Sequence, residues 1–297
     1  MIFFPLNELN ETCKGAVLKF VKKYESGCVQ LSATILKSPQ KIYACFVNDI
    51  LPRNLYGVLS LGKTVLHCLP FLNAEKQTAL QSNFVSSLCE FYRTGEIPLP
   101  SCVNGLKNGS SLILKALSEL KKTPSQINEY DLLRLDINEF LKISPFPFTE
   151  KEQLVRCKSD LPEPLFQSLL SLQKEYEIEE VVPDCFEFNE DSTRLKLRGN
   201  LRRQYILALD AGDENLVSKA QTNAIGARFV QLGGIYTNPD YRRKHYSFNT
   251  VYFLIQRILK AKKLPILYVK KQNFKALSLY KSLKFVKFND YIIAYFA

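Results

Sequence analysis

The sequence predicts a two-domain α/β protein with mixed sheets covered by helices. Its 297 residues exceed the usual size of one domain. A content of 46% apolar and 23% charged residues is typical of folded globular chains and excludes disordered and fibrous ones. Strand-like and helix-like patterns alternate along the whole chain, which favours helices layered on sheets.

The first predicted domain covers residues 1–147. Its predicted strands are apolar and β-branched runs between turn residues, and its predicted helices space their apolar residues by three and four. In chain order we predict helices 7–24 and 28–37, strands 41–49, 54–61 and 64–71, helix 74–93, strand 99–105, helix 107–120 and strand 127–135.

The second predicted domain covers residues 148–297. We predict helices 149–157 and 163–181, strands 204–210, 214–222 and 228–237, helix 245–261, strand 264–270, helix 273–283 and a closing strand or hairpin at 285–296. Pro183 ends the second helix, and Pro265 marks the start of the strand after the long helix.

The order of the predicted elements indicates an internal duplication. The strand at Pro98 leads to the helix at Lys107 with the same spacing as the strand at Leu264 leads to the helix at Asn273, nine residues in each half. Generic alternation of α/β layers is the alternative explanation. The Pro-rich segment Ile143–Glu150 is the predicted domain boundary.

The sequence predicts a cytoplasmic protein that neither spans a membrane nor holds a metal. No run of about 18 apolar residues occurs, and the N-terminus has no basic region before an apolar stretch. The eight cysteines are scattered singly, without a CxxC pair, and the chain has only two histidines. Single cysteines inside apolar runs are usually small core residues, so we assign them no chemistry.

The net charge of +11 is concentrated in one region of the chain. Arg242–Ala297 contains 13 Lys and Arg residues and one acid, whereas Lys174–Asp191 contains eight acids and one Lys. Polyanions would be attracted to the basic region and cations to the acidic one, although both can simply be solvated surfaces.

A match to the phosphate-binding pattern GxxxxGK[ST] occurs at residues 57–64, GVLSLGKT. A phosphate-binding loop of this kind needs a helix directly after the Lys-Thr pair, but the following VLHCLPFL has a strand pattern. We therefore interpret Gly62-Lys63 as the turn of a hairpin and expect no ATP binding.

Two stretches of the second half carry the strongest functional signal. In QLGGIYTNPDYRRKHYS, residues 231–247, a strand leads through a basic turn into a predicted helix N-terminus, where free N–H groups and the helix dipole attract anions. In NFKALSLYKSLKF, residues 273–285, an Asn starts a helix that presents a Tyr two turns later. Together, in this order and with one helix and one strand between them, they resemble the GNAT superfamily of acyl-CoA-dependent N-acetyltransferases.

The resemblance implies a GNAT-like fold for the second domain, a degenerate copy for the first, and acetyl-CoA as co-substrate. Its implied activity is direct transfer of an acetyl group to the amine of a small molecule or peptide. The cofactor-binding residues that it implies are Ile235, Tyr236 and Thr237 of the strand, Arg242, Arg243, Lys244, His245, Tyr246 and Ser247 of the turn, and Asn273.

The resemblance also implies catalytic residues. Tyr280 would donate a proton to the departing thiolate. The base would be a carboxylate or a water held by polar side chains, for which the sequence offers Gln231 or the acidic segment, where Glu179 is our candidate. An amide N–H near Ile235–Thr237 would polarise the thioester carbonyl. The acidic segment would attract a cationic amine.

The chain departs from the family pattern at four positions. Arg243, His245 and Ser247 stand where the family's pyrophosphate loop has small residues, mostly glycine, and Lys284 replaces a glycine of the second motif. Two other functions therefore stay open from the sequence. They are a non-catalytic CoA-binding or sensing protein and, less favoured because no recognition motif is present, a nucleic-acid-binding protein.

Overall fold

The computed structural model of the chain describes residues 1–70, 78–182 and 187–296. The chain divides into two compact units. The first consists of Met1–Leu132, Gly226–Arg228 and Asn289–Ala297, and the second of Leu133–Ile225 and Phe229–Phe288. The division precedes the Pro-rich segment 143–150, and the domain boundary at 147/148 stays a prediction.

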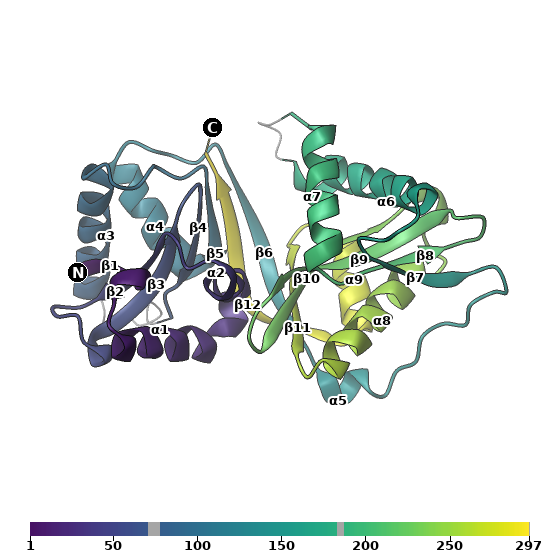
Figure 1. Cartoon of the computed structure of the whole chain (residues 1–297), viewed down its shortest axis with the longest axis horizontal. Helices are drawn as coiled ribbons and strands as arrows, with labels where there is room; N and C mark the ends of the chain where they lie inside the picture. Colours follow the sequence, from purple (N-terminus) through teal and green to yellow (C-terminus); the bar gives the residue numbers. More distant parts are fainter. Residues whose placement is uncertain (71–77, 183–186, 297) are drawn as a thin grey trace. The chain divides into compact units, whose positions relative to one another are not determined.

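The first unit has the sheet order β1-β2-β3-β4-β5, next to which lies the C-terminal part of β12. Its elements, shown from purple to teal in Figure 1, are β1 (Ile2–Pro5), α1 (Glu11–Lys23), α2 (Val29–Lys37), β2 (Ile42–Phe46), β3 (Leu55–Leu61), β4 (Thr64–Cys68), α3 (Thr78–Arg93), β5 (Cys102–Leu106), α4 (Lys107–Glu119) and β6 (Gln126–Leu135), whose residues from Leu133 onward belong to the second unit.

The second unit has the sheet order β7-β8-β9-β10-β11, followed by β6. Its elements are α5 (Ile137–Phe140), β7 (Gln153–Cys157), α6 (Glu163–Tyr176) with a π-helical turn (Glu177–Val181), α7 (Glu190–Arg203), β8 (Ile206–Asp210), β9 (Leu216–Ile225), β10 (Phe229–Thr237), α8 (Tyr246–Lys260), β11 (Leu264–Lys270), α9 (Phe274–Ser282) and the start of β12 (Phe285–Tyr295), whose residues from Asn289 onward belong to the first unit.

The two halves of the chain have the same order of principal elements. Each begins with a strand and two helices, continues with three strands, and ends with helix, strand, helix, strand. The α/β class with a mixed sheet is confirmed, because β4–β5 and β10–β11 are parallel pairs among antiparallel ones. The shared order supports the predicted duplication.

Both faces of the second sheet are covered by helices, which explains why successive residues of its strand β8, pointing to opposite faces, are all buried. Along β8, Leu207 packs with α8 and α9, whereas Ile206 and Ala208 pack with α6 and α7. Figure 1 shows α6 and α7 on one side of this sheet and α8 and α9 on the other.

The structure corrects one predicted element and adds two that were not predicted. Residues 149–157 contain strand β7 in place of a helix, because Gln153–Cys157 pairs antiparallel with β8. Helix α7 and strand β1 have no counterpart among the predicted elements. The hairpin interpretation of residues 57–64 is confirmed, since β3 and β4 pair antiparallel across Gly62-Lys63.

No helix of the described residues is both long and apolar enough to cross a bilayer. In the same part of the chain, no three His, Cys, Asp or Glu side chains are grouped to bind a metal. The seven cysteines that the structure describes are free thiols, and Cys185 lies outside the described residues.

Candidate functional site

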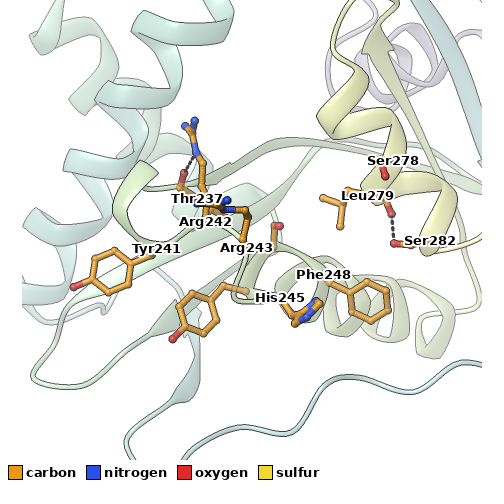
Figure 2. A pocket seen from close by; sticks show the side chains of 11 residues that line it. Thr237, Tyr241, Arg242, Arg243, His245, Phe248, Ser278, Leu279 and Ser282 are labelled. Atoms are coloured by element: carbon orange, nitrogen blue, oxygen red, sulfur yellow. Dashed lines mark hydrogen bonds between the residues drawn. The ribbon is translucent and has the colours of Figure 1, made fainter.

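A cavity of about 330 Å³ opens at the C-terminal end of β10. One wall is the turn between Thr237 and Phe248, and the opposite wall is formed by Ser278, Leu279 and Ser282 of α9. Figure 2 shows these side chains around the cavity, with Arg242 and Arg243 on the turn and His245 and Phe248 at the start of α8. The cavity thus joins the two sequence motifs within the second unit.

The turn has a conformation that glycine would adopt easily. Arg243 (φ 66°) and His245 (φ 60°) are left-handed, and both stand at family glycine positions. His245 is the N-cap of α8, and its ring stacks on Phe146 with 3.6 Å between centroids. Asn249 holds the Phe146 backbone through both of its amide atoms, at 2.9 and 3.0 Å. The turn closes without its glycines because packing compensates for the strained backbone.

Lys284 also stands at a position where the family has glycine, in this case at the end of a helix. It follows the C-cap of α9 with φ 67°, the conformation in which glycine usually ends helices. We expect Lys284→Gly to raise the free energy of unfolding by about 1 kcal/mol, because it relieves a left-handed side-chain residue. Urea titration of the variant measures this gain. Lys196→Gly, at an exposed position inside α7, is the matched control and should lose about 1 kcal/mol.

The cationic side chains of the turn are partly engaged by the chain itself. Arg242 donates from Nε to the Thr237 carbonyl oxygen at 3.0 Å and from a terminal nitrogen to Glu179 at 3.0 Å. Glu179 also accepts from the Tyr236 hydroxyl at 2.5 Å. The hydrogen bond from Tyr236 lowers the pKa of the Glu179 carboxyl group most, and the bond from Arg242 lowers it further. Glu179 is therefore a weaker base than an ordinary carboxylate.

The remaining side chains of the turn are those of Lys244, Tyr246 and Ser247. Lys244 lies over the Tyr241 ring at 5.1 Å, and Ser247 lines the cavity. Tyr246 donates to the Glu152 carboxylate at 2.6 Å, which raises the pKa of Tyr246 to about 12. The structure thus brings Thr237, Arg242, Arg243, His245, Tyr246 and Ser247 to one cavity.

Strand β10 separates from β11 along most of its length. The two strands pair in parallel only from Phe229 to Gln231, and the register of β10 with β9 shifts between Gly233 and Tyr236. Ile235 therefore lies in the irregular stretch that the resemblance predicts. Gln231 is 4% exposed, and its Nε2 atom has no hydrogen-bond partner within the described residues.

The two residues singled out in the second motif, Asn273 and Tyr280, lie at the start and inside of α9. Asn273 caps α9 by accepting from the Ala276 N–H at 3.0 Å, and its amide donates to Glu180 at 3.2 Å. Tyr280 is buried outside the lining of the cavity, and burial followed by the nearby Tyr176 and Glu180 raises its pKa. The phenol of Tyr280 is thus kept protonated.

Two residues of the site were not among those predicted from the sequence. Lys219 of β9 is fully buried, and Tyr176 at the end of α6 lies against it. Lys219 could have been noticed because it occupies an inward position in the alternation of LVSKAQT, where a charged side chain is exceptional. No comparable signal marked Tyr176, which has the spacing of an ordinary core residue.

The comparisons with known proteins agree with this geometry. Residues 213–293 match the family model of FR47-like proteins. A Drosophila protein of solved structure has a TM-score of 0.63 and 13% identity over 99% of this chain and 98% of its own. A tandem GNAT protein from the clavulanic acid biosynthesis pathway has a TM-score of 0.58 and 11% identity, with 99% and 96% covered.

A GNAT-family acetyltransferase from Colwellia psychrerythraea has a TM-score of 0.53 and 9% identity, with 94% of this chain and 97% of its own covered. No curated protein matches the sequence significantly. At these identities the likeness concerns the fold, and it extends over both halves of the chain. The chain therefore has the fold of a tandem GNAT protein, with an FR47-like region in its C-terminal half.

Proposed function

We propose that the second unit binds acetyl-CoA and transfers its acetyl group to a primary amine. The observation that carries this proposal is the cavity at the N-terminus of α8, where Arg242 and Arg243 lie beside the free N–H groups of a helix. A helix N-terminus with adjacent cations suits a pyrophosphate. The left-handed residues of the turn give it the backbone path that the family's glycines provide.

The residues of the open strand supply the chemistry of acyl transfer. The backbone of β10 beyond Gln231 is free of β11 and can pair with an extended ligand arm, while Asn273 offers its amide from the facing helix. An N–H of this stretch would donate to the thioester carbonyl oxygen. Tyr280 would donate its proton to the sulfur as the carbon–nitrogen bond forms and the carbon–sulfur bond breaks, and the proton that the amine loses would restore the phenol through water.

The acceptor amine is proposed to approach from the side of α6. Glu179 and Glu180 lie at this end of the sheet, but both contact residues of the cofactor site, Arg242 and Asn273. Their carboxylates would have to exchange these partners before they could attract a cationic amine. Turnover of acetyl-CoA with amines of different charge tests this class of acceptor, and binding without turnover of any amine would favour the sensing function.

The first unit is proposed to bind neither CoA nor ATP. The parallel pairing of β4 with β5 covers Thr64–Leu66, and the next residue, His67, is buried where these strands separate. Its imidazole takes the space that side chains at Gly105 and Gly109 would need, and it is hydrogen-bonded to Ser110 at 2.9 Å. Burial lowers the pKa of His67 to about 4, so the ring is neutral. The corresponding turn, residues 71–76, lies outside the described residues.

We expect Arg242→Ala to weaken acetyl-CoA binding about 5- to 30-fold. A charge-assisted hydrogen bond to phosphate contributes about 1.5–3 kcal/mol, and part of this is offset because Arg242 must leave Glu179. Isothermal titration calorimetry measures the dissociation constants. Arg202→Ala, an exposed arginine at the end of α7, is the control and should bind like the wild type. Unchanged affinity in Arg242→Ala, or no binding by the wild type at millimolar concentration, contradicts the assignment.

A further inference from the structure

Lys219 is a buried lysine that the proposed mechanism has not used. Its side chain is 0% exposed on the α6 face of β9, and Nζ lies 4.6 Å from the centre of the Tyr176 ring. The negative charge of Glu177 acts on Lys219, but the Glu177 carboxylate is held by Gln173 at 2.9 Å and Thr193 at 2.6 Å. Burying an amine in such surroundings destabilises the fold, so an apolar residue would be the more stable choice.

The one hydrogen bond that the structure shows for Nζ is to the backbone. Nζ donates to the Gly234 carbonyl oxygen at 2.7 Å. The Gly234 backbone also acts on the Tyr176 phenol, where it opposes the rise in pKa that burial causes. Lys219 and Tyr176 therefore both lie against the backbone of Gly234.

Gly234 is the turning point of the irregular stretch of β10. Its φ is +56°, and a Cβ built on it would come within 2.7 Å of the Gln221 side chain. The register shift between Gly233 and Tyr236 includes this residue. Only a glycine fits here without strain, and the backbone direction is set by the side chains that hold it.

The bond to Lys219 determines where the next N–H points. The described chain has no cis peptide bond, so the Gly234 carbonyl and the Ile235 N–H point in opposite directions within their shared peptide plane. Because Lys219 holds the carbonyl oxygen, the Ile235 N–H points away from Lys219. The pairing of β10 with β11 has already ended at Gln231 and Ile266, so β11 does not continue the ladder there.

We propose that Lys219 is a positioning residue: it fixes the Gly234–Ile235 peptide so that the Ile235 N–H donates to the carbonyl oxygen of the bound acyl thioester. The inference rests on the proposed function and adds to it how the oxyanion donor is oriented. Both the ammonium and the neutral amine can donate this hydrogen bond, so the peptide keeps its direction in either protonation state. The groups around Nζ are the Tyr176 ring and Glu177 from the α6 side and Cys157 from β7.

The test compares two ligands that differ only in the carbonyl oxygen, acetyl-CoA and S-ethyl-CoA. Calorimetry without acceptor amine should show that the wild type prefers acetyl-CoA about 5- to 10-fold, as expected for one hydrogen bond. Lys219→Met should abolish this preference and leave S-ethyl-CoA affinity within about 3-fold. In acetyl transfer it should lower kcat about 100-fold and raise the KM for acetyl-CoA by no more than the about 5- to 10-fold that is lost in binding.

Gly234→Ala disturbs the same peptide by a different route and should give the same loss of preference. Gly212→Ala is the matched control, because Gly212 also has a positive φ (+112°) but lies in the turn before β9. It should keep the preference for acetyl-CoA. A wild type without preference, or a preference that persists in both Lys219→Met and Gly234→Ala, overturns the inference. A wild type that binds neither ligand contradicts the proposed function, and the inference with it.

Discussion

Replacing Tyr280 by Phe is expected to lower the turnover of acetyl transfer by about 10- to 1000-fold, with a much smaller change in the KM for acetyl-CoA. The phenol stays protonated because burial, Tyr176 and Glu180 all raise its pKa, so it can donate to a thiolate throughout the neutral range. Phe keeps the packing against the Phe285 ring, which lies 6.1 Å away between centroids. Steady-state kinetics with saturating amine measure both constants.

Tyr252→Phe provides the control for this experiment. Tyr252 is also buried in the second unit, but its hydroxyl donates to the Ile143 carbonyl oxygen at 3.3 Å, on the packing side of α8. Its loss should affect stability more than turnover. Equal turnover in Tyr280→Phe and the wild type would assign Tyr280 to the core, and an effect on KM alone would assign it to binding.

Replacing Lys219 by Met is expected to stabilise the protein at pH 7 and to change how its stability depends on pH. Burial lowers the pKa of Lys219 from 10.5 to about 7 in the folded state, against the weaker opposing effects of Glu177 and Cys157. Between these two values the unfolded chain holds a proton that the folded chain has released. The free energy of unfolding of the wild type therefore rises as pH increases from 7 to 10.5. The destabilisation caused by Lys219 is greatest below pH 7.

Met cannot take up a proton, so the variant lacks this dependence. The advantage of Lys219→Met over the wild type should shrink by about 3 kcal/mol between pH 7 and pH 10, because other groups cancel in the difference. Urea unfolding at the two pH values measures it. Lys260→Met, an exposed lysine of α8, should show a constant difference. A constant difference for Lys219→Met as well would mean that Lys219 is charged in the folded protein.

The two effects expected of Lys219→Met, higher stability and lower turnover, both arise from one residue of β9. They therefore connect stability with function. Lys219 destabilises the fold below pH 7, and its hydrogen bond is directed to the backbone of the proposed acyl site. A protein under selection for stability alone would have an apolar residue there. The expected gain in stability and the expected loss of turnover in Lys219→Met are therefore two results of the same burial.

Local patterns predicted the elements that position the candidate site. Strand β11 agrees with its prediction at both ends, because Pro265 and a short apolar run mark it clearly. Helix α8 differs from its predicted range by only one residue at each end. The prediction was this close because the apolar residues of the helix repeat every three or four positions. These patterns reflect burial on one face of an element, which neighbouring residues in the sequence already express.

Elements that depend on distant partners could not be predicted in the same way. Gln153–Cys157 has a short ambiguous pattern, and it is a strand because β8 offers a free edge with matching register. Helix α7 buries few residues, among them Thr193, Leu197 and Leu201, so its mostly charged sequence carried only a faint periodicity. Tertiary pairing and packing decided both, as they often override local propensity.

The sequence by itself determined the order of the two motifs, the basic turn before α8, and the choice of Asn273 and Tyr280 on the same helix. Only the tertiary structure showed that Arg242 is shared with Glu179, that Asn273 contacts Glu180, and that Lys219 holds Gly234. The physical reason is distance along the chain. Motifs are local and follow from residue spacing, whereas a buried amine and the carbonyl that it binds are brought together by two strands whose register arises from the packing of the whole sheet.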